Sequence, residues 1–543
     1  EPADLSSSEL IARIISEDPE ERMPPVKGGK KLDAKQIELL RKWVLSGAPY
    51  SEPWAYVPPK NHPLPVTADK KWGKNWIDSF VLSGLEKEGL EPSPEADPAT
   101  LVRRLYFDLT GLPLKPEAVE SYNRNADKEA GYEKLVDELL GSQHFGERMA
   151  VYWLDLVRFA DTVGYHGDQD HNITPYRDYV IDAFSLNLPF DRFTREQIAG
   201  DLLENPTMDQ QVATGYNRLL QTSHEGGVQA KEYLAIYAAD RMRNLSAVWM
   251  GATLGCAQCH DHKYDPYTTR DFYAMSAFFA DIDEVEHFRV GSNSLPTRRP
   301  PEIKVFSRRD RELLAGLEAV TPRTKDIEKQ IAGVKSRQRL TMVTRSIKPR
   351  VTRVLPRGNW LDESGDIVDP AVPAFMGKLA AGEGRATRLD LANWLTDVEN
   401  GSGGLTARVF VNRLWYLFFG EGISRSLDDF GGQGLPPDNP ALLDRLAVEF
   451  YGAKWNIKHM VKLLVMSQAY RQSSIAAEDS MKRDPLNRFF GRQSRYRLPA
   501  EMIRDNALAV GGLLVLDYGG ASSKPFQPAG YYRHLNFPQR KYK

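Results

Sequence analysis

The sequence predicts a mainly α-helical, multi-domain protein with minor β segments. Apolar residues recur at helical spacing through most of the 543 residues, whereas β-like alternation is confined to residues 348–375. At roughly 150 residues per domain, the length corresponds to about three or four domains. No internal repeat with the period of a solenoid is present in the sequence.

Composition narrows the function classes. The chain is 41% apolar and 27% charged, with a formal net charge of −2, so it has no general attraction to nucleic acid or to anionic membranes. The longest apolar run, residues 507–516, contains two Gly and is shorter than the roughly 18 residues of a membrane helix. Only two Cys are present, which excludes a disulfide-rich scaffold. We therefore expect neither a nucleic-acid partner nor a membrane span.

Residues 1–60 are predicted to form a small N-terminal unit that ends in a linker. Helices are expected over residues 5–15 and 34–45. Between them, the segment Glu-Arg-Met-Pro-Pro places Met23 directly before two prolines. The Pro-rich stretch 53–65 is expected to be a linker or a wrapping arm.

Residues 70–290 are expected to form a helical domain. Its apolar stripes begin at four places, near Trp76, Leu101, Tyr132 and Met149. Asp97, followed by Pro, is a helix N-cap candidate. A polar loop is expected over residues 161–175, and one long helix over residues 230–254.

Residues 291–347 are basic and partly helical, and we interpret them as a connector. Residues 348–543 are expected to form a mainly helical C-terminal domain. Its helices are predicted over residues 389–397, 405–419, 440–451, 457–470 and 499–510.

The two cysteines lie in one motif, Cys-Ala-Gln-Cys-His, which spans Cys256, Cys259 and His260. This spacing is the attachment signature of a c-type haem. Each thiol adds to one haem vinyl group, and the histidine that follows supplies the proximal ligand to iron. Random placement of two Cys and a His in this order has a chance on the order of one in ten thousand.

Two other interpretations of the motif stay open. Cys256, Cys259, His260 and His262 could bind zinc, although four ligands from one short loop are awkward. A thioredoxin-like redox pair also uses Cys-x-x-Cys, but it expects a strand before the motif where a helix is predicted here.

The ligand on the iron face opposite His260 would decide the function. A second His or Met would favour electron transfer, and an open position would permit chemistry on a substrate. We select His262, His224 and His166 as candidates near the cofactor. For His262 the alternatives are a partner of the haem propionates and a loop histidine bonded to the backbone.

Two further constellations could bind ligands. Asp161, Asp168, Asp170 and Asp178 could form a Ca²⁺ site, or they could be a solvated acidic loop. The second group could bind a sugar or a sulfate through forked Arg donors, or it could consist of buried Arg–Asp pairs that fix a loop against a helix. It comprises Arg408, Asn412, Arg413, Asp428 and Asp429.

Common catalytic signatures are absent from the sequence. It contains no Gly-x-Ser-x-Gly elbow, Walker A loop, His-Glu-x-x-His helix or Gly-x-Gly-x-x-Gly turn after a strand. Hydrolase, kinase, metalloprotease and nicotinamide-dependent functions therefore lose most of their support.

Many separate stretches resemble the planctomycete-type cytochrome c domain proteins. In the first half they are residues 146–161, 175–178, 189–193, 199–203, 225–227 and 256–266. Residues 405–415, 429–431 and 499–505 resemble the planctomycete-specific C-terminal domain that accompanies the cytochrome-bearing domain. The resemblance covers nearly all of the chain and implies an exported, haem-bearing redox protein without a defined reaction.

The resemblance also gives a role to the N-terminal unit, as the tail of a small cytochrome domain. Its Met-Pro-Pro segment would supply an axial ligand, Met23, to a second haem. No Cys-x-x-Cys-His precedes Cys256, and the sequence stops at Lys543, short of where the family's C-terminal domain usually continues. The resemblance therefore leads us to expect that both ends of the family's usual length are missing.

The function expected from these observations is that of an exported c-type cytochrome, periplasmic or extracellular. It would act in electron transfer or as a haem-dependent oxidoreductase, with an extracellular carbohydrate as a conjectured substrate. Its partner would be an electron donor or acceptor protein, or a second haem segment. The alternatives are an electron-relay or structural haem subunit of a larger assembly, and a glycan-binding protein.

Overall fold

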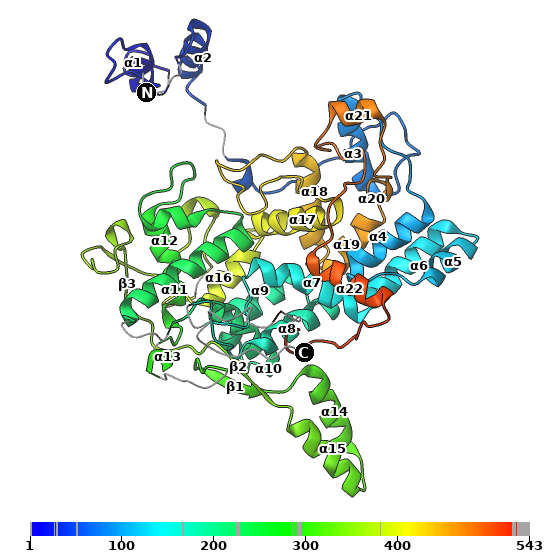
Figure 1. Cartoon of the computed structure of the whole chain (residues 1–543). Coiled ribbons are helices and arrows are strands. Elements are labelled where there is room, and N and C mark those ends of the chain that lie inside the picture. The colour runs from blue at the N-terminus through cyan, green and yellow to red at the C-terminus, as the bar shows by residue number, and fades with distance from the viewer. Residues whose placement is uncertain are drawn as a thin grey trace. The chain divides into compact units, whose positions relative to one another are not determined.

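The structure is a computed structural model. It describes residues 3–25, 28, 31–49, 53–165, 168–223, 228–284, 286–289, 296–380, 382–523 and 528. Over these ranges helices dominate and strands are few and short, which confirms the mainly α prediction (Figure 1). The chain divides into two compact units, Glu1–Val57 and Pro58–Lys543.

The first unit is a pair of helices, α1 (Glu9–Ile15) and α2 (Ala34–Leu45), around a small core of Ile11, Ile14 and Val44. Helix α2 has the predicted bounds. Helix α1 begins later than predicted, because the Asp4 carboxylate accepts hydrogen bonds from Ser6 and Ser7 and holds that stretch in a turn.

In the second unit, the part before the Cys motif is helical, as predicted. Its helices are α3 (Trp76–Lys87), α4 (Pro98–Thr110), α5 (Pro116–Arg124), α6 (Lys128–Gly141), α7 (Gln143–Leu156), α8 (Thr174–Ser185), α9 (Phe190–Ala199), α10 (Met208–Ala213) and α11 (Ala230–Leu245). The predicted cap is confirmed, since the Asp97 side chain accepts from the Thr100 amide at 3.0 Å.

The long helix predicted over residues 230–254 ends earlier than expected. Helix α11 passes into a π-helical turn, η5 (Ser246–Met250), and stops at Gly251, whose φ is +53°. The Arg413 guanidinium donates to the Ala247 and Val248 carbonyls at 2.6 and 2.5 Å. A distant side chain thus satisfies the carbonyls that end this turn, and a short 3-10 helix, η6 (Leu254–Gln258), leads into the motif.

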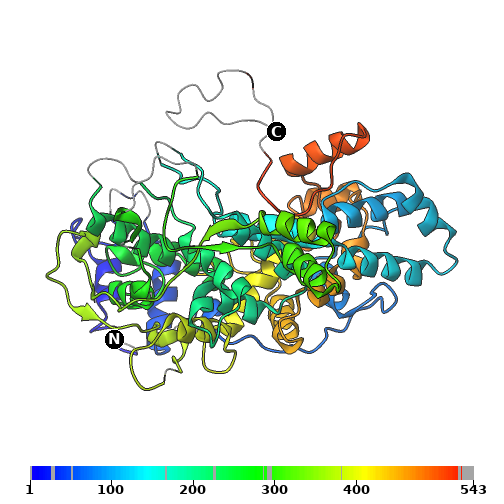
Figure 2. The same cartoon turned by 90° about the horizontal axis from the view of Figure 1, so that it is seen from below.

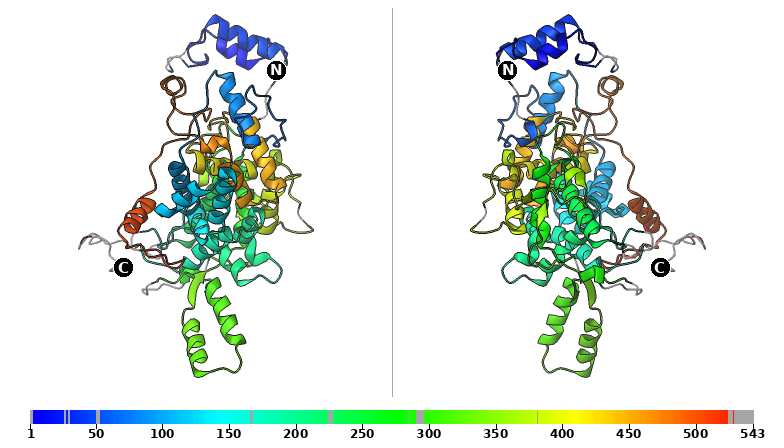
Figure 3. Two further views of the ribbon diagram at one scale, coloured as in Figure 1. Left: turned by 90° about the vertical axis from the view of Figure 1, so that its right-hand side faces the viewer. Right: turned by 90° about the vertical axis from the view of Figure 1, so that its left-hand side faces the viewer.

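Between the two helical parts lie short helices and two small antiparallel sheets. Helices α12 (Thr269–Ser276), η7 (Ala277–Asp281) and α13 (Glu286–Arg289) follow the motif. Strands β1 (Glu302–Val305) and β2 (Arg339–Met342) pair with Glu302 opposite Met342, and β3 (Thr352–Arg353) pairs with β4 (Ile367–Val368). A helical hairpin, α14 (Arg308–Ala319) and α15 (Lys325–Lys335), connects β1 to β2 (Figure 3).

The C-terminal part is helical at each predicted place, and its helices are α16 (Arg388–Thr396), α17 (Gly403–Phe419), α18 (Pro440–Gly452), α19 (Ile457–Val465), α20 (Gln468–Arg471), α21 (Glu478–Arg483) and α22 (Ala500–Val510). The helix predicted over residues 457–470 is split, because the Ser467 side chain accepts from the Tyr470 amide and caps a new helix.

Helices far apart in the sequence share one core in the second unit. Helix α16 packs against α9, and α19 packs against α6 (Figures 1 and 2). The rings of Phe190 and Phe410 lie 4.2 Å apart, and Phe410 stacks on Phe450 at 5.0 Å. The segments before and after the connector are therefore joined by a common aromatic interior.

Residues 58–62, the part of the Pro-rich stretch that belongs to the second unit, bind along α18. Asp444 accepts from the Lys60 amide at 3.2 Å, contacts His62 Nε2 at 3.1 Å and pairs with Arg408. Arg445 donates to the His62 carbonyl at 2.5 Å. Of the two predicted roles, the contacts of residues 58–62 are those of a wrapping arm. None of the helices formed by the described residues is long and apolar enough to cross a membrane.

Candidate functional site

The Cys motif lies at the surface of the second unit. Cys256 is in η6 and Cys259 follows its end, and both residues are exposed with free thiols. His260 is exposed, and its Nδ1 donates to the Asp261 carbonyl at 2.8 Å. Since a carbonyl only accepts, Nδ1 carries the proton and Nε2 is the nitrogen left to bind a ligand. Histidines that bind metals commonly hold their other nitrogen in this way.

His262 is buried, and its two ring nitrogens contact residues on either side of the motif. Its Nδ1 accepts from the Asp265 amide at 2.9 Å, and its Nε2 lies 3.1 Å from the Thr253 hydroxyl. Its own amide donates to the Tyr267 carbonyl at 2.8 Å. Of the two roles considered for His262, this geometry is that of a loop histidine bonded to the backbone.

We expect His262→Ala to destabilise the loop that carries the motif. The substitution leaves the buried Asp265 amide without its acceptor, which costs about 1–3 kcal/mol. Urea unfolding would measure the loss. His459→Ala is the matched control, because His459 is a surface residue paired with Glu449 at 2.7 Å and its removal is expected to leave the midpoint unchanged. Equal midpoints for the two variants would contradict this role.

A Gly-rich loop of the C-terminal part, residues 428–432, holds the loop that carries the motif, and we call it the Gly-rich clamp. Asp265 accepts from the Gly432 amide at 2.8 Å, and the Phe430 amide donates to the Gly251 carbonyl at 2.7 Å. A Cβ on Gly431 would lie 2.2 Å from Asp265 Oδ2, so only glycine fits there. The motif is thus held by residues more than 150 positions away in the sequence.

Asp428 and Asp429 belong to this clamp. Asp428 is exposed, whereas Asp429 is partly buried and accepts from the Gly431 amide at 2.9 Å. Burial, together with the nearby carboxylates of Asp265 and Asp428, raises the pKa of Asp429 above its usual range.

The other candidates on α17 use their polar groups inside the protein. Arg408 pairs with Asp444 at 2.6 Å, and Asn412 exchanges two hydrogen bonds with Ser424 at 2.8 and 2.9 Å. Arg413 ends η5, and burial lowers its pKa to about 10. These three side chains reach three different partners, which corresponds to the alternative of buried pairs that fix loops against a helix.

The remaining predicted residues are dispersed. His166 and His224 lie outside the described residues. Asp178 is on α8, where it pairs with Arg339 and accepts from the Gly520 amide at 2.7 Å. Within the described ranges, no group of three or more His, Cys, Asp or Glu is placed to hold a metal ion. Met23 is exposed in the first unit.

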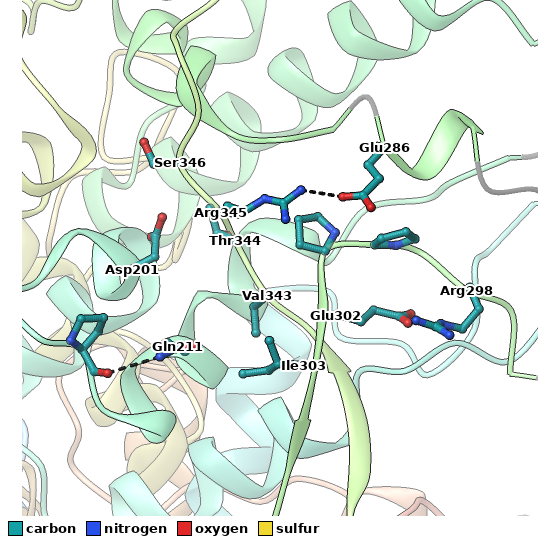
Figure 4. A pocket seen from close by; sticks show the side chains of 13 residues that line it. Asp201, Gln211, Glu286, Arg298, Glu302, Ile303, Val343, Thr344, Arg345 and Ser346 are labelled. Carbon is teal, nitrogen blue, oxygen red and sulfur yellow. Dashed lines mark hydrogen bonds and ion pairs between the residues drawn. The ribbon is translucent and has the colours of Figure 1, made fainter.

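One cavity was not anticipated from the sequence. It has a volume of about 630 Å³ and lies beside β1 and β2 (Figure 4). Arg345 points from its wall toward Glu286, 2.5 Å away, and also pairs with Asp283. Arg388 holds Asp201 at 2.8 Å. These charged groups neutralise one another, and the lining comes from segments too scattered for a sequence motif.

Two family models match the chain. PSCyt2, a protein of unknown function (DUF1549), matches residues 76–284, and PSD1, a protein of unknown function (DUF1553), matches residues 387–543. The chain is similar to both of these planctomycete cytochrome-associated domain families. The Cys motif lies in the PSCyt2 match, and the Gly-rich clamp lies in the PSD1 match. No curated protein and no solved structure matches the chain.

The two matches agree with the family part of the sequence prediction. The two matched segments share the aromatic core described above. Residues 285–386, which hold the hairpin and both small sheets, lie outside the two matches.

Proposed function

We propose that this protein is an exported c-type cytochrome in which Cys256 and Cys259 carry a haem and His260 binds its iron. The exposure and hydrogen bonding of these three side chains support the proposal. Both thiols are free and exposed, and His260 presents Nε2 because Nδ1 is bonded to Asp261. Covalent attachment needs accessible thiols, and binding of the iron needs an imidazole of this tautomer.

The residues around the motif fit this role. His262 and Asp265 fix the loop from inside, and the Gly-rich clamp fixes it from the PSD1 side. The thiols and the imidazole are therefore held on a supported surface, as a cofactor site requires. A haem bound there would supply one-electron redox chemistry.

Exposure of the motif favours exchange of electrons with another protein over reaction in an enclosed pocket. An exposed attachment site places the cofactor within reach of a docked donor or acceptor, whereas substrate chemistry usually needs a concave site. We therefore place electron transfer first. Oxidation of a carbohydrate stays a prediction, because the α17 residues considered for sugar binding make contacts inside the protein.

His260→Ala tests the assignment of the iron ligand. In protein produced with haem-maturation machinery, we expect the variant to keep covalently bound haem through its thiols but to lose the absorption spectrum of the histidine-ligated wild type. His459→Ala, on α19, is the control and should keep the wild-type spectrum. Identical spectra for His260→Ala and wild type would contradict the assignment.

The reaction of the wild type with carbon monoxide separates the two functions. A haem that does not bind carbon monoxide has both axial positions of its iron filled, which supports a function in electron transfer. One that binds it has an open position, which supports oxidoreductase chemistry.

A further inference from the structure

A turn outside both family matches lies against the second cysteine of the motif. It comprises residues 355–359, between β3 and β4, and we call it the 355–359 turn. Strand β3 lies beside α12, the helix that follows the motif (Figure 1). The turn is closed by the Gly358 amide, which donates to the Leu355 carbonyl at 2.9 Å.

Tyr273 of α12 ties this turn to the motif. Its hydroxyl lies 3.1 Å from the Gln258 carbonyl oxygen and 3.3 Å from the Leu355 carbonyl oxygen. Burial, and then the nearby Cys259, raises the pKa of Tyr273 to about 12, so the hydroxyl keeps the proton that it donates. One side chain therefore fixes the spacing between the 355–359 turn and the residue before Cys259.

Gly358 lies beside the Cys259 sulfur. Its φ is +71°, and a Cβ built on it would lie 3.0 Å from Cys259 Sγ and 3.5 Å from Gln258 Cγ. Real Cβ atoms seldom come that close to a neighbour, so the bare backbone of Gly358 forms a wall against the sulfur. The preceding residue, Arg357, is also left-handed, with a φ of 56°.

We propose that Gly358 is a positioning residue for haem attachment at Cys259. The wall limits the rotamers of the thiol and leaves its opposite side open to the vinyl group. This inference rests on the proposed function. In the reaction the S–H group adds across the vinyl double bond. A carbon–sulfur bond forms, the π bond is lost and the thiol proton passes to the terminal vinyl carbon, with no net oxidation.

The first test uses the reduced protein without haem. Iodoacetamide labels both thiols, and fragment-ion masses give the labelling rate at Cys259 relative to Cys256 in the same chain. We expect Gly358→Ala to lower that ratio about two- to tenfold, because the added methyl group crowds the sulfur out of its rotamer. Gly512→Ala is the matched control, since its φ is +68° and no atom lies within 4 Å of its Cβ position. An unchanged ratio in Gly358→Ala would overturn the proposal.

Tyr273→Phe provides a second variant should Gly358→Ala fold poorly. It keeps the buried ring but removes the hydroxyl that holds the 355–359 turn. The turn can then move away from the sulfur, so we expect the labelling ratio to rise, opposite to the effect of Gly358→Ala. A ratio equal to that of the wild type would count against the proposal.

The second test is made with haem-maturation machinery. We expect the wild type to carry two thioethers, and Gly358→Ala to accumulate a product bound only through Cys256 with a free thiol at Cys259. If the wild type acquires no haem, the proposed function fails. The labelling ratio of Cys259 to Cys256 would still show whether Gly358 restricts the Cys259 thiol. If Gly358→Ala carries both thioethers at the wild-type yield, the positioning role fails and the proposed function stands.

Discussion

Replacing both cysteines, Cys256→Ala together with Cys259→Ala, is expected to give a folded but colourless protein. The wild type, produced with the same maturation machinery, is expected to keep its haem absorbance after denaturation, because thioether bonds survive unfolding. Both side chains are exposed, so their loss is expected to change the free energy of unfolding by no more than about 0.5 kcal/mol. The loss of colour would therefore report the chemistry of the thiols and not the fold.

A single substitution separates the contributions of the two thiols to haem attachment. Cys256→Ala alone is expected to retain haem through Cys259, at reduced yield. Absorbance and a haem stain after denaturing electrophoresis would compare the three proteins. Covalent haem in the double variant would show that attachment uses other residues, which would contradict the role proposed for Cys256 and Cys259.

Arg388→Ala is expected to have the largest effect on stability, a loss of about 3–5 kcal/mol. Arg388 is completely buried on α16. It pairs with Asp201 at 2.8 Å and with Asp281 at 2.9 Å, both in the PSCyt2 match. Although burial opposes its charge, the hydrogen bonds to these two carboxylates raise its pKa above the usual range. Its removal leaves two carboxylates without a buried cation.

Denaturant unfolding would measure this loss. The control is Arg270→Ala, because Arg270 pairs at the surface with Asp366 at 3.7 Å, a contact that contributes less than about 1 kcal/mol. Adding Asp201→Asn and Asp281→Asn to an Arg388→Met variant should recover part of the stability, since no buried charge is then left unpaired. A loss below 1 kcal/mol in Arg388→Ala would contradict the role of this network in joining the two parts.

Helix positions could be predicted because local signals set them. Asp33 and Gln36 form the capping box of α2, and Asp97 caps α4 just before a proline. Such signals act within one turn of helix and are legible in a single sequence. The long helix over residues 230–254 was the main departure. Its end depends on Arg413, which is far away in the sequence and carries no local mark.

The same contrast applies to the candidate site. The motif at Cys256, Cys259 and His260 could be found from its spacing. The residues that hold the motif in place could not be predicted from the sequence. Gly431 is important only because it lies against Asp265, and Gly358 only because it lies against Cys259. For the Arg residues of α17 the sequence left two alternatives open, a ligand site and buried pairs. The structure shows the second, because these residues contact Asp444 and η5.

Haem attachment at the motif can be read from the mass of the peptide that contains it, isolated from the wild type after haem maturation. We predict that the peptide with Cys256 and Cys259 carries the full mass of one haem and has no thiol left to alkylate. The same peptide without added mass, with both thiols open to alkylation, would contradict the assignment of this protein as a c-type cytochrome.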